Sequence, residues 1–155
     1  MNTLQMHSSY TVGPDTVLRK YEYIDHTGDL GFKAYGTTRQ ALFSHAAEAF
    51  FQALVRIETI QEKEERLIEL EAAALDDLMV AWLSELLFLF DTENLLLRRF
   101  EITNMTDHGL RARVGGEVMD PARHEIKTGI KAVTYHQLYV RQRGGVWEAQ
   151  VILDI

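Results

Sequence analysis

Two carboxylates, an imidazole and a hydroxyl group lie within one short stretch, Asp25-His26-Thr27-Gly28-Asp29. Hard cations such as calcium bind clustered oxygen atoms, and aspartate supplies both the oxygen ligands and negative charge. Gly28 would let the chain bend sharply beside such a site. The alternative is an ordinary turn in which the aspartate and threonine side chains accept hydrogen bonds from backbone amides. The spacing alone leaves both interpretations open.

A second pair of anionic groups stands at the end of the sequence, where Asp154 precedes Ile155. Residues 146–155 alternate in the way a β-strand does, which places Asp154 on the face opposite Leu153. An ordered strand would hold the side-chain carboxylate of Asp154 and the carboxylate of Ile155 close enough to face one cation. Because chain ends are often frayed, the alternative is an exposed charge that binds nothing.

Lys131 is a third candidate, because it lies in a stretch that predicts a strand, residues 130–141. Alternation puts Lys131 and Val133 on one face and Thr134 and His136 on the other. A lysine in this position either faces solvent or contacts an anion or a partner. The pattern by itself favours the solvent-facing interpretation, and it favours a hydrogen-bonded core role for His136 over a ligand role.

The sequence contains none of the short motifs that mark a self-contained enzyme. It has no cysteine, which excludes disulfides, zinc–thiolate sites and cysteine nucleophiles. It also has no phosphate-binding glycine loop, GxSxG elbow or HExxH motif, and Asp120-Pro121 with His124 indicates a turn before it indicates a site. The serines lie in the N-terminal stretch or inside predicted helices: Ser8, Ser9, Ser44 and Ser84. These observations indicate a protein that is not an enzyme.

Two helices are predicted. Residues 38–55 place their apolar side chains on one helical face, and Thr37 with Gln40 can form a capping box at the helix start. Residues 78–90 are apolar almost all round and follow two aspartates, whose charge suits a helix N-terminus. A helix of this second kind is usually buried in the domain or covered by a partner.

Short alternating segments predict strands on either side of these helices: residues 21–24, 30–35, 66–73, 100–104, 110–114, 130–141 and 146–155. Turn residues such as Gly144-Gly145 predict hairpins between the later strands. Strands interrupted by two main helices predict an α+β fold whose strands are mostly antiparallel. Since no repeat or linker divides the chain, residues 20–155 are expected to form one domain, preceded by a flexible tail over residues 1–19.

The charge balance disfavours nucleic acid as the direct partner. With 16 basic and 23 acidic residues the formal net charge is −7, and a phosphate backbone would repel such a chain. A protein partner with a basic surface is easier to accommodate. No apolar run has the length of a membrane helix and the N-terminal stretch has no signal-peptide core, so a cytoplasmic location is expected.

In their order and composition these segments resemble the archease family. The resemblance is carried by residues 23–36 (YIDHTGDLGFKAYG), 78–91 (LMVAWLSELLFLFD), 116–117 (GE), 130–138 (IKAVTYHQL) and 151–155 (VILDI). Together they extend over residues 21–155. Two positions depart from the family pattern, because Gly28 stands where alanine is expected and Gln137 stands where glycine is common.

The resemblance implies a sandwich-like domain that assists an RtcB-type RNA ligase, the enzyme that joins tRNA halves with GTP and manganese. Archeases are described as promoting guanylylation of that ligase and its multiple turnover, in tRNA splicing or RNA repair. The family's metal site corresponds here to Asp29, Asp154 and Ile155, the last through its carboxylate or backbone oxygen. Calcium is the expected ion, with magnesium as the alternative. Lys131 corresponds to a residue linked to activity, and His26 is a further candidate for partner contact. RNA would be contacted only indirectly, and neither DNA nor a membrane is an expected partner.

Three other functions are compatible with the sequence. The first is a general chaperone or modulator of RNA-processing enzymes that binds through the apolar helix, residues 78–90. The second is a direct RNA binder that gathers six arginines on one sheet face: Arg98, Arg99, Arg111, Arg113, Arg141 and Arg143. The third is a metal-dependent hydrolase that uses Asp25, His26 and Asp29, which the small ligand set disfavours.

Overall fold

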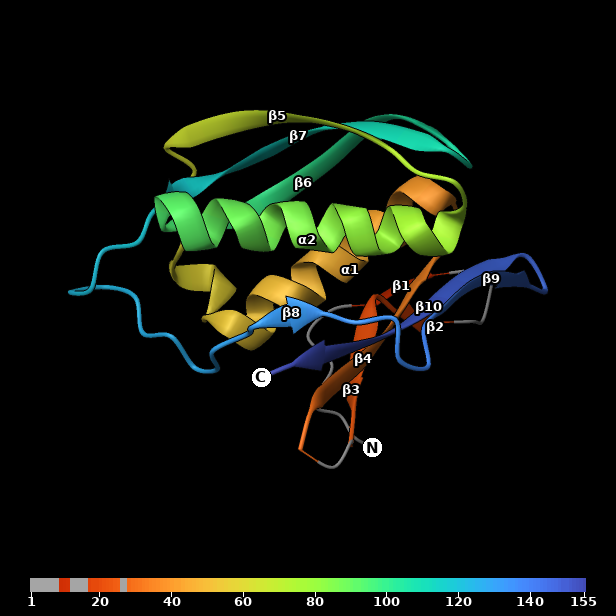
Figure 1. Cartoon of the computed structure of the whole chain (residues 1–155), viewed down its shortest axis with the longest axis horizontal. Helices are drawn as coiled ribbons and strands as arrows, with labels where there is room; N and C mark the ends of the chain where they lie inside the picture. Colours follow the sequence, from red (N-terminus) through yellow and green to blue (C-terminus); the bar gives the residue numbers. More distant parts are fainter. Residues whose placement is uncertain (1–8, 12–16, 26–27) are drawn as a thin grey trace.

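The computed structural model describes residues 9–11, 17–25 and 28–155, and Figure 1 shows the course of the chain. The helices are α1 (Arg39–Leu54), α2 (Leu75–Glu93) and a short 3-10 helix (Ile57–Thr59). The strands, in chain order, are β1 (Ser9–Thr11), β2 (Val17–Arg19), β3 (Tyr21–Ile24), β4 (Leu30–Gly36), β5 (Glu64–Glu71), β6 (Leu95–Thr106), β7 (Gly109–Val118), β8 (Ala132–Val133), β9 (Tyr139–Arg143) and β10 (Val146–Asp154).

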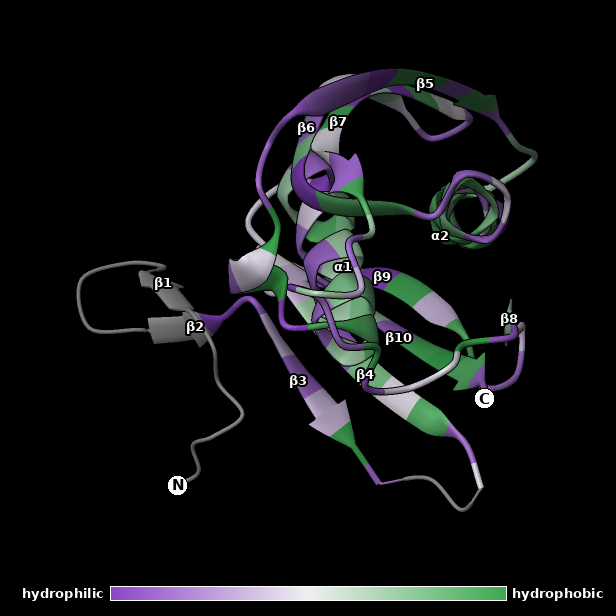
Figure 2. Cartoon of the chain, turned by 90° about the vertical axis from the view of Figure 1, so that its left-hand side faces the viewer, coloured by the Kyte–Doolittle hydropathy of each residue, from purple (hydrophilic) through white to green (hydrophobic). Residues whose placement is uncertain are grey.

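All strand pairs among the described residues are antiparallel, and apart from the small β1-β2 pair they form two sheets. One sheet has the order β3-β4-β10, and β8 and β9 both pair with the other side of β10; the second sheet has the order β5-β7-β6. Helix α1 lies between the two sheets, and α2 lies beside it, as Figure 2 shows with α2 end-on. The predicted α+β sandwich with two main helices is confirmed.

Large aromatic side chains fill the space between the sheets. Trp82 of α2 is fully buried, and its indole Nε1 donates a hydrogen bond to the backbone oxygen of Phe43, 2.9 Å away. Phe51 of α1 stacks on Phe100 of β6 with ring centroids 5.7 Å apart. Burial of one such side chain contributes roughly 2–3 kcal/mol, so these contacts fasten α1 both to α2 and to the β5-β7-β6 sheet.

Helix α1 forms where the sequence predicts it, but its cap lies one residue later. The N-cap is Thr38, whose backbone is still extended and whose hydroxyl accepts a hydrogen bond from the amide of Ala41 at 3.0 Å. The predicted capping box of Thr37 and Gln40 is therefore wrong. Because β4 continues through Gly36, the chain has only two residues in which to leave the strand, and the helix begins after the second.

Helix α2 is longer than predicted, and it is not buried all round. It ends at Asn94, which adopts a left-handed backbone conformation (φ +56°) and donates its amide to the oxygen of Phe90 at 2.9 Å. Most of its apolar side chains are buried, whereas Phe88 is 57% exposed. Among the described residues, neither this helix nor α1 is long and apolar enough to cross a membrane.

The prediction of one strand over residues 130–141 is wrong. Only β8 and β9 are strands in this range, and the chain leaves the sheet between them. Within that loop the hydroxyl of Tyr135 donates to a carboxylate oxygen of Asp77 at 2.9 Å, and Gln137 has a left-handed backbone with φ +53°. The alternating pattern could not predict this loop, because it forms where β10 exchanges one neighbouring strand for the next.

Replacing Gln137 by glycine is expected to stabilise the fold by up to about 1 kcal/mol. A left-handed backbone strains any residue with a β-carbon, whereas glycine adopts it freely. The hydrogen bond that Gln150 Nε2 donates to the backbone oxygen of residue 137, at 2.9 Å, would be retained. Urea unfolding measures the change. As a control, His136→Gly should lower stability, because it adds only freedom to the unfolded chain. A Gln137→Gly variant less stable than the native chain would contradict the prediction.

The predicted tail, residues 1–19, contains the antiparallel pair β1 and β2, in which Tyr10 lies opposite Leu18. The remaining residues of the tail lie outside the described residues. The flexibility of the tail and the domain boundary at residue 20 therefore stay predictions.

Candidate functional site

The aspartates singled out in the sequence lie at one end of the sheet that contains β4 and β10. The antiparallel register pairs Leu30 with Leu153, so Asp29, which precedes Leu30, and Asp154, which follows Leu153, lie at the same end of the sheet. Two carboxylates that are far apart in the sequence are thus brought to one corner of the molecule, here called the acidic edge (Asp29, Asp154 and Ile155).

A packed apolar base lies next to the acidic edge. A β-carbon at Gly31 would lie 2.8 Å from both Ile152 Cδ1 and Ile24 Cγ1, so the two isoleucines occupy the space that a side chain would need. Ile152 is buried, and β10 continues to Asp154. The strand predicted over residues 146–155 therefore forms as far as Asp154, and its pairing with β8 holds the backbone of Asp154 in the sheet.

Lys131 is joined to the same edge through its backbone. Its amide donates a hydrogen bond to the carbonyl oxygen of Asp154 at 2.7 Å, and Ala132 pairs with Asp154 in β8. The register therefore sets Lys131 beside Ile155, and both side chains are exposed. The structure brings the lysine and the predicted metal-binding residues together.

The loop before Asp29 is described only at its ends. His26, the candidate for partner contact, lies outside the described residues, and Asp25 is exposed at the end of β3. Gly28 has a left-handed backbone with φ +76°. This conformation favours glycine, and it gives a physical reason for the departure from the alanine of the family pattern.

The oxygen atoms of the acidic edge fit a hard cation better than zinc, because all the predicted ligands are oxygens. Calcium takes six to eight oxygen ligands, so three protein residues would leave positions for water or for oxygen atoms of a partner. Within the described part of the chain, no three histidine, aspartate or glutamate side chains form a group that could hold a metal. The predicted metal-binding set has fewer such side chains, because it consists of the carboxylates of Asp29 and Asp154 and an oxygen of Ile155.

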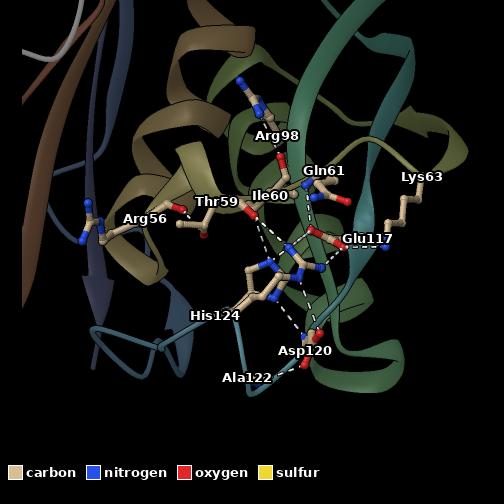
Figure 3. Close-up of polar contacts among 11 residues, drawn as sticks. Arg56, Thr59, Ile60, Gln61, Lys63, Arg98, Glu117, Asp120, Ala122 and His124 are labelled. Carbon is tan, nitrogen blue, oxygen red and sulfur yellow. Dashed lines mark hydrogen bonds and ion pairs between the residues drawn. The ribbon is translucent and has the colours of Figure 1, made fainter.

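A second polar cluster surrounds the buried carboxylate of Glu117 and includes Asp120 and His124 of the predicted turn, whereas the role of Glu117 was not predicted (Figure 3). This carboxylate lies 2.5 Å from Arg123 Nη2 and 3.6 Å from Lys63 Nζ, and it accepts a hydrogen bond from the amide of Gln61 at 2.7 Å. The Arg123 guanidinium is the main cause that lowers the pKa of Glu117 to about 2, against the opposing effect of burial. The available signal was a glutamate among the apolar residues of a strand, followed closely by arginine and histidine.

His124 completes this cluster. Its Nδ1 accepts a hydrogen bond from the amide of Asp120 at 2.9 Å, so the ring proton lies on Nε2, which is 3.1 Å from a carboxylate oxygen of Glu117 and 3.2 Å from the oxygen of Thr59. The ring is buried with both nitrogens engaged. We therefore assign the cluster a structural role: it holds the start of the loop that leads from β7 to Lys131.

The six arginines of the RNA-binding alternative do not share one sheet face. Arg141 and Arg143 belong to β9, in the other sheet from the remaining four. Arg98 donates a hydrogen bond to the oxygen of Ile60 at 2.9 Å, and Arg99 is paired with glutamates, including Glu62 at 2.8 Å. Since the ion pairs neutralise part of the positive charge and the rest is divided between sheets, this arrangement disfavours a phosphate-binding surface.

Comparison with known proteins gives a consistent result. Residues 21–155 match the model of the archease protein family. A protein archease from Methanosarcina mazei is 38% identical over 141 residues, which cover 88% of this chain and 97% of that protein. A protein archease from Pyrococcus abyssi is 36% identical over 142 residues, which cover 89% of this chain and all of that protein.

Two solved structures share the fold. The solution structure of protein 1598 from Methanobacterium thermoautotrophicum has a TM-score of 0.75 and 34% identity, and the match covers 88% of this chain and 99% of that chain. The crystal structure of an archease from Thermotoga maritima, described as a "possible chaperone", has a TM-score of 0.63 and 20% identity, covering 85% of this chain and 94% of that chain. At 20% identity the likeness concerns the fold alone.

Proposed function

Because the chain belongs to the archease family, we propose that it is a non-catalytic, metal-binding accessory protein that activates an RtcB-type RNA ligase. The observation that supports this proposal is that Asp29 and Asp154 lie at the same end of one sheet, where the Lys131 amide donates a hydrogen bond to the carbonyl oxygen of Asp154. The strand register and the buried base beneath it support a restrained site with fixed charge. In this proposal the protein acts in the cytoplasm, and the ligase makes the direct contacts to RNA.

The residues of the acidic edge would hold the metal through oxygen atoms of Asp29, Asp154 and Ile155. A bound calcium ion supplies positive charge that attracts phosphate or carboxylate oxygens of a partner. The side chain of Lys131, which is exposed beside Ile155, adds a second positive charge at the same corner. On a chain with formal net charge −7, the ion would neutralise the charges of Asp29 and Asp154, so this corner would no longer repel the anionic groups at the nucleotide site of the ligase.

The test is multiple-turnover RNA ligation by the cognate ligase with GTP and manganese, with and without this protein. We expect product to exceed one equivalent per ligase only when the protein is present. An active ligase whose turnover is unchanged by stoichiometric protein would show that the proposed function is wrong.

A general chaperone is the second candidate, and the exposed Phe88 is the observation that favours it, since exposed apolar side chains can bind unfolded clients. The Thermotoga maritima archease is itself described as a "possible chaperone". This alternative predicts that the protein suppresses aggregation of unrelated clients and that a calcium chelator has no effect. Ligase activation that is lost in folded Asp29→Asn and Asp154→Asn variants, with manganese present throughout, distinguishes the first function from the second.

A further inference from the structure

Helix α2 carries a stripe of partly or fully exposed side chains that the metal-site proposal does not use. Asp77, Ala81, Ser84, Phe88 and Asp91 recur at the three- and four-residue spacing that keeps them on one side of a helix, and we call them the α2 stripe. The opposite side of the helix is buried, whereas Phe88 is 57% exposed. An aromatic side chain is thus presented to solvent on a helix that is otherwise packed into the core.

The α2 stripe lies on the same side of the molecule as the acidic edge. Tyr135 is 58% exposed, and its hydroxyl donates to a carboxylate oxygen of Asp77, so this ring extends the stripe toward the loop after β8. Figures 1 and 2 both show α2, β8 and the C-terminal end on one side of the fold. A partner that reached the acidic edge from this side would also face the stripe.

The charges of α2 all have one sign. The helix contains no lysine or arginine, and its acidic residues are Asp76, Asp77, Glu85, Asp91 and Glu93. Negative charge near a helix C-terminus opposes the helix dipole, and Glu93 is compensated there by Arg66 at 2.7 Å. The last turn contains no basic residue that would compensate Asp91. An exposed aromatic ring and an exposed carboxylate thus lie three residues apart near the C-terminal end of the helix.

We propose that the α2 stripe and Tyr135 form a docking surface for an apolar patch of the ligase that is bordered by lysine and arginine side chains. This inference rests on the proposed function and specifies the chemistry of the partner surface. Phe88 and Tyr135 would enter apolar pockets, as aromatic side chains do at protein interfaces. The small residues Ala81 and Ser84 leave room for partner side chains between them. Asp77 and Asp91 would face the basic border.

Other occupants fit this surface less well. A second copy of the chain would bring two acidic stripes together, and like charges across an interface are unfavourable. Nucleic acid would be repelled by the same charges. Charge complementarity therefore selects a basic protein surface, which also associates faster at low ionic strength.

The test measures the affinity of the full chain for the cognate ligase at low and at moderate salt. Phe88→Ser is expected to weaken binding at least about tenfold, with an unchanged Tm because the side chain is mostly exposed. Leu67→Ser is the matched control: Leu67 is 77% exposed but belongs to β5, on the other sheet from β8 and β10. Its substitution should leave the affinity unchanged.

Asp91→Lys separates docking from a structural role. Lysine at this position complements the helix dipole, so the Tm should be equal or higher, while binding should weaken several-fold and lose part of its salt dependence. If Phe88→Ser and Asp91→Lys bind the ligase as tightly as the native chain, and the native chain both binds and activates it, the docking surface is wrong and the proposed function still stands. A native dimer that Phe88→Ser dissociates would overturn the docking surface too. A native chain that neither binds nor activates an active ligase would refute the proposed function itself.

Discussion

Replacing Asp154 by asparagine should weaken calcium binding at least about tenfold and return ligation to one turnover per ligase. The substitution removes a formal charge from the acidic edge but leaves the backbone in place, including the bond from the Lys131 amide to the carbonyl oxygen of residue 154. The side chain is exposed, so the fold should be retained. Calorimetric titration with calcium and a multiple-turnover ligation assay measure the two effects.

Two further variants make this prediction specific. Asp25→Asn removes an exposed carboxylate from the end of β3, close in sequence to Asp29, and should change neither calcium affinity nor turnover. Lys131→Met should bind calcium as the native chain does and yet fail to promote turnover. Native turnover by a folded Asp154→Asn chain would count against the metal-dependent function, and Asp29→Asn provides an independent repeat of that test.

Replacing Glu117 by glutamine should destabilise the fold by about 3 kcal/mol at pH 7. Glu117 is 2% exposed, and removing the buried charge of an ion pair takes away the interactions that compensated its burial and leaves its partners with weaker ones. The affected partners are Arg123 at 2.5 Å and the buried ring of His124 at 3.1 Å. Urea unfolding of the variant and of the native chain measures the difference. As a control, Glu65→Gln removes an exposed carboxylate that pairs with Arg99, and it should cost less than about 1 kcal/mol.

The same variant should reveal the pH dependence of this ion pair. The pKa of Glu117 is about 2 in the folded state and 4.5 ordinarily, so the ionised carboxylate stabilises the fold fully above pH 4.5. Its contribution is lost as the pH falls through about 2. The stability difference between the native chain and Glu117→Gln should therefore be constant from pH 7 to about 5 and shrink below that. A difference that stayed constant down to pH 2 would show that the carboxylate is not responsible.

Elements with strong local periodicity could be predicted from the sequence. Helix α1 and strand β10 follow the predicted patterns almost to their ends, because their apolar residues recur with the period of a helix and of a strand. The single apolar face predicted for α1 is incomplete, because residues 49–54 are buried on all sides between the two sheets. The sequence predicts the N-cap of α1 one residue too early, because Thr37 and Thr38 have the same side chain and only the end of β4 decides between them. The break near Gln137 was missed because alternation continues through a segment that leaves the sheet.

By itself the sequence determined the residue types available for chemistry, the two helices and most strands, and the resemblance that the family comparison bears out. Only the tertiary structure decided which of these residues meet. Register between strands distant in the chain brings Asp29 and Asp154 to the same end of one sheet and joins the Lys131 amide to Asp154. The path of the loop after β7 buries Glu117 against Arg123. Such contacts depend on long-range pairing and packing, which local periodicity does not encode. A helix or strand pattern specifies which face is buried, but it does not specify which element covers that face.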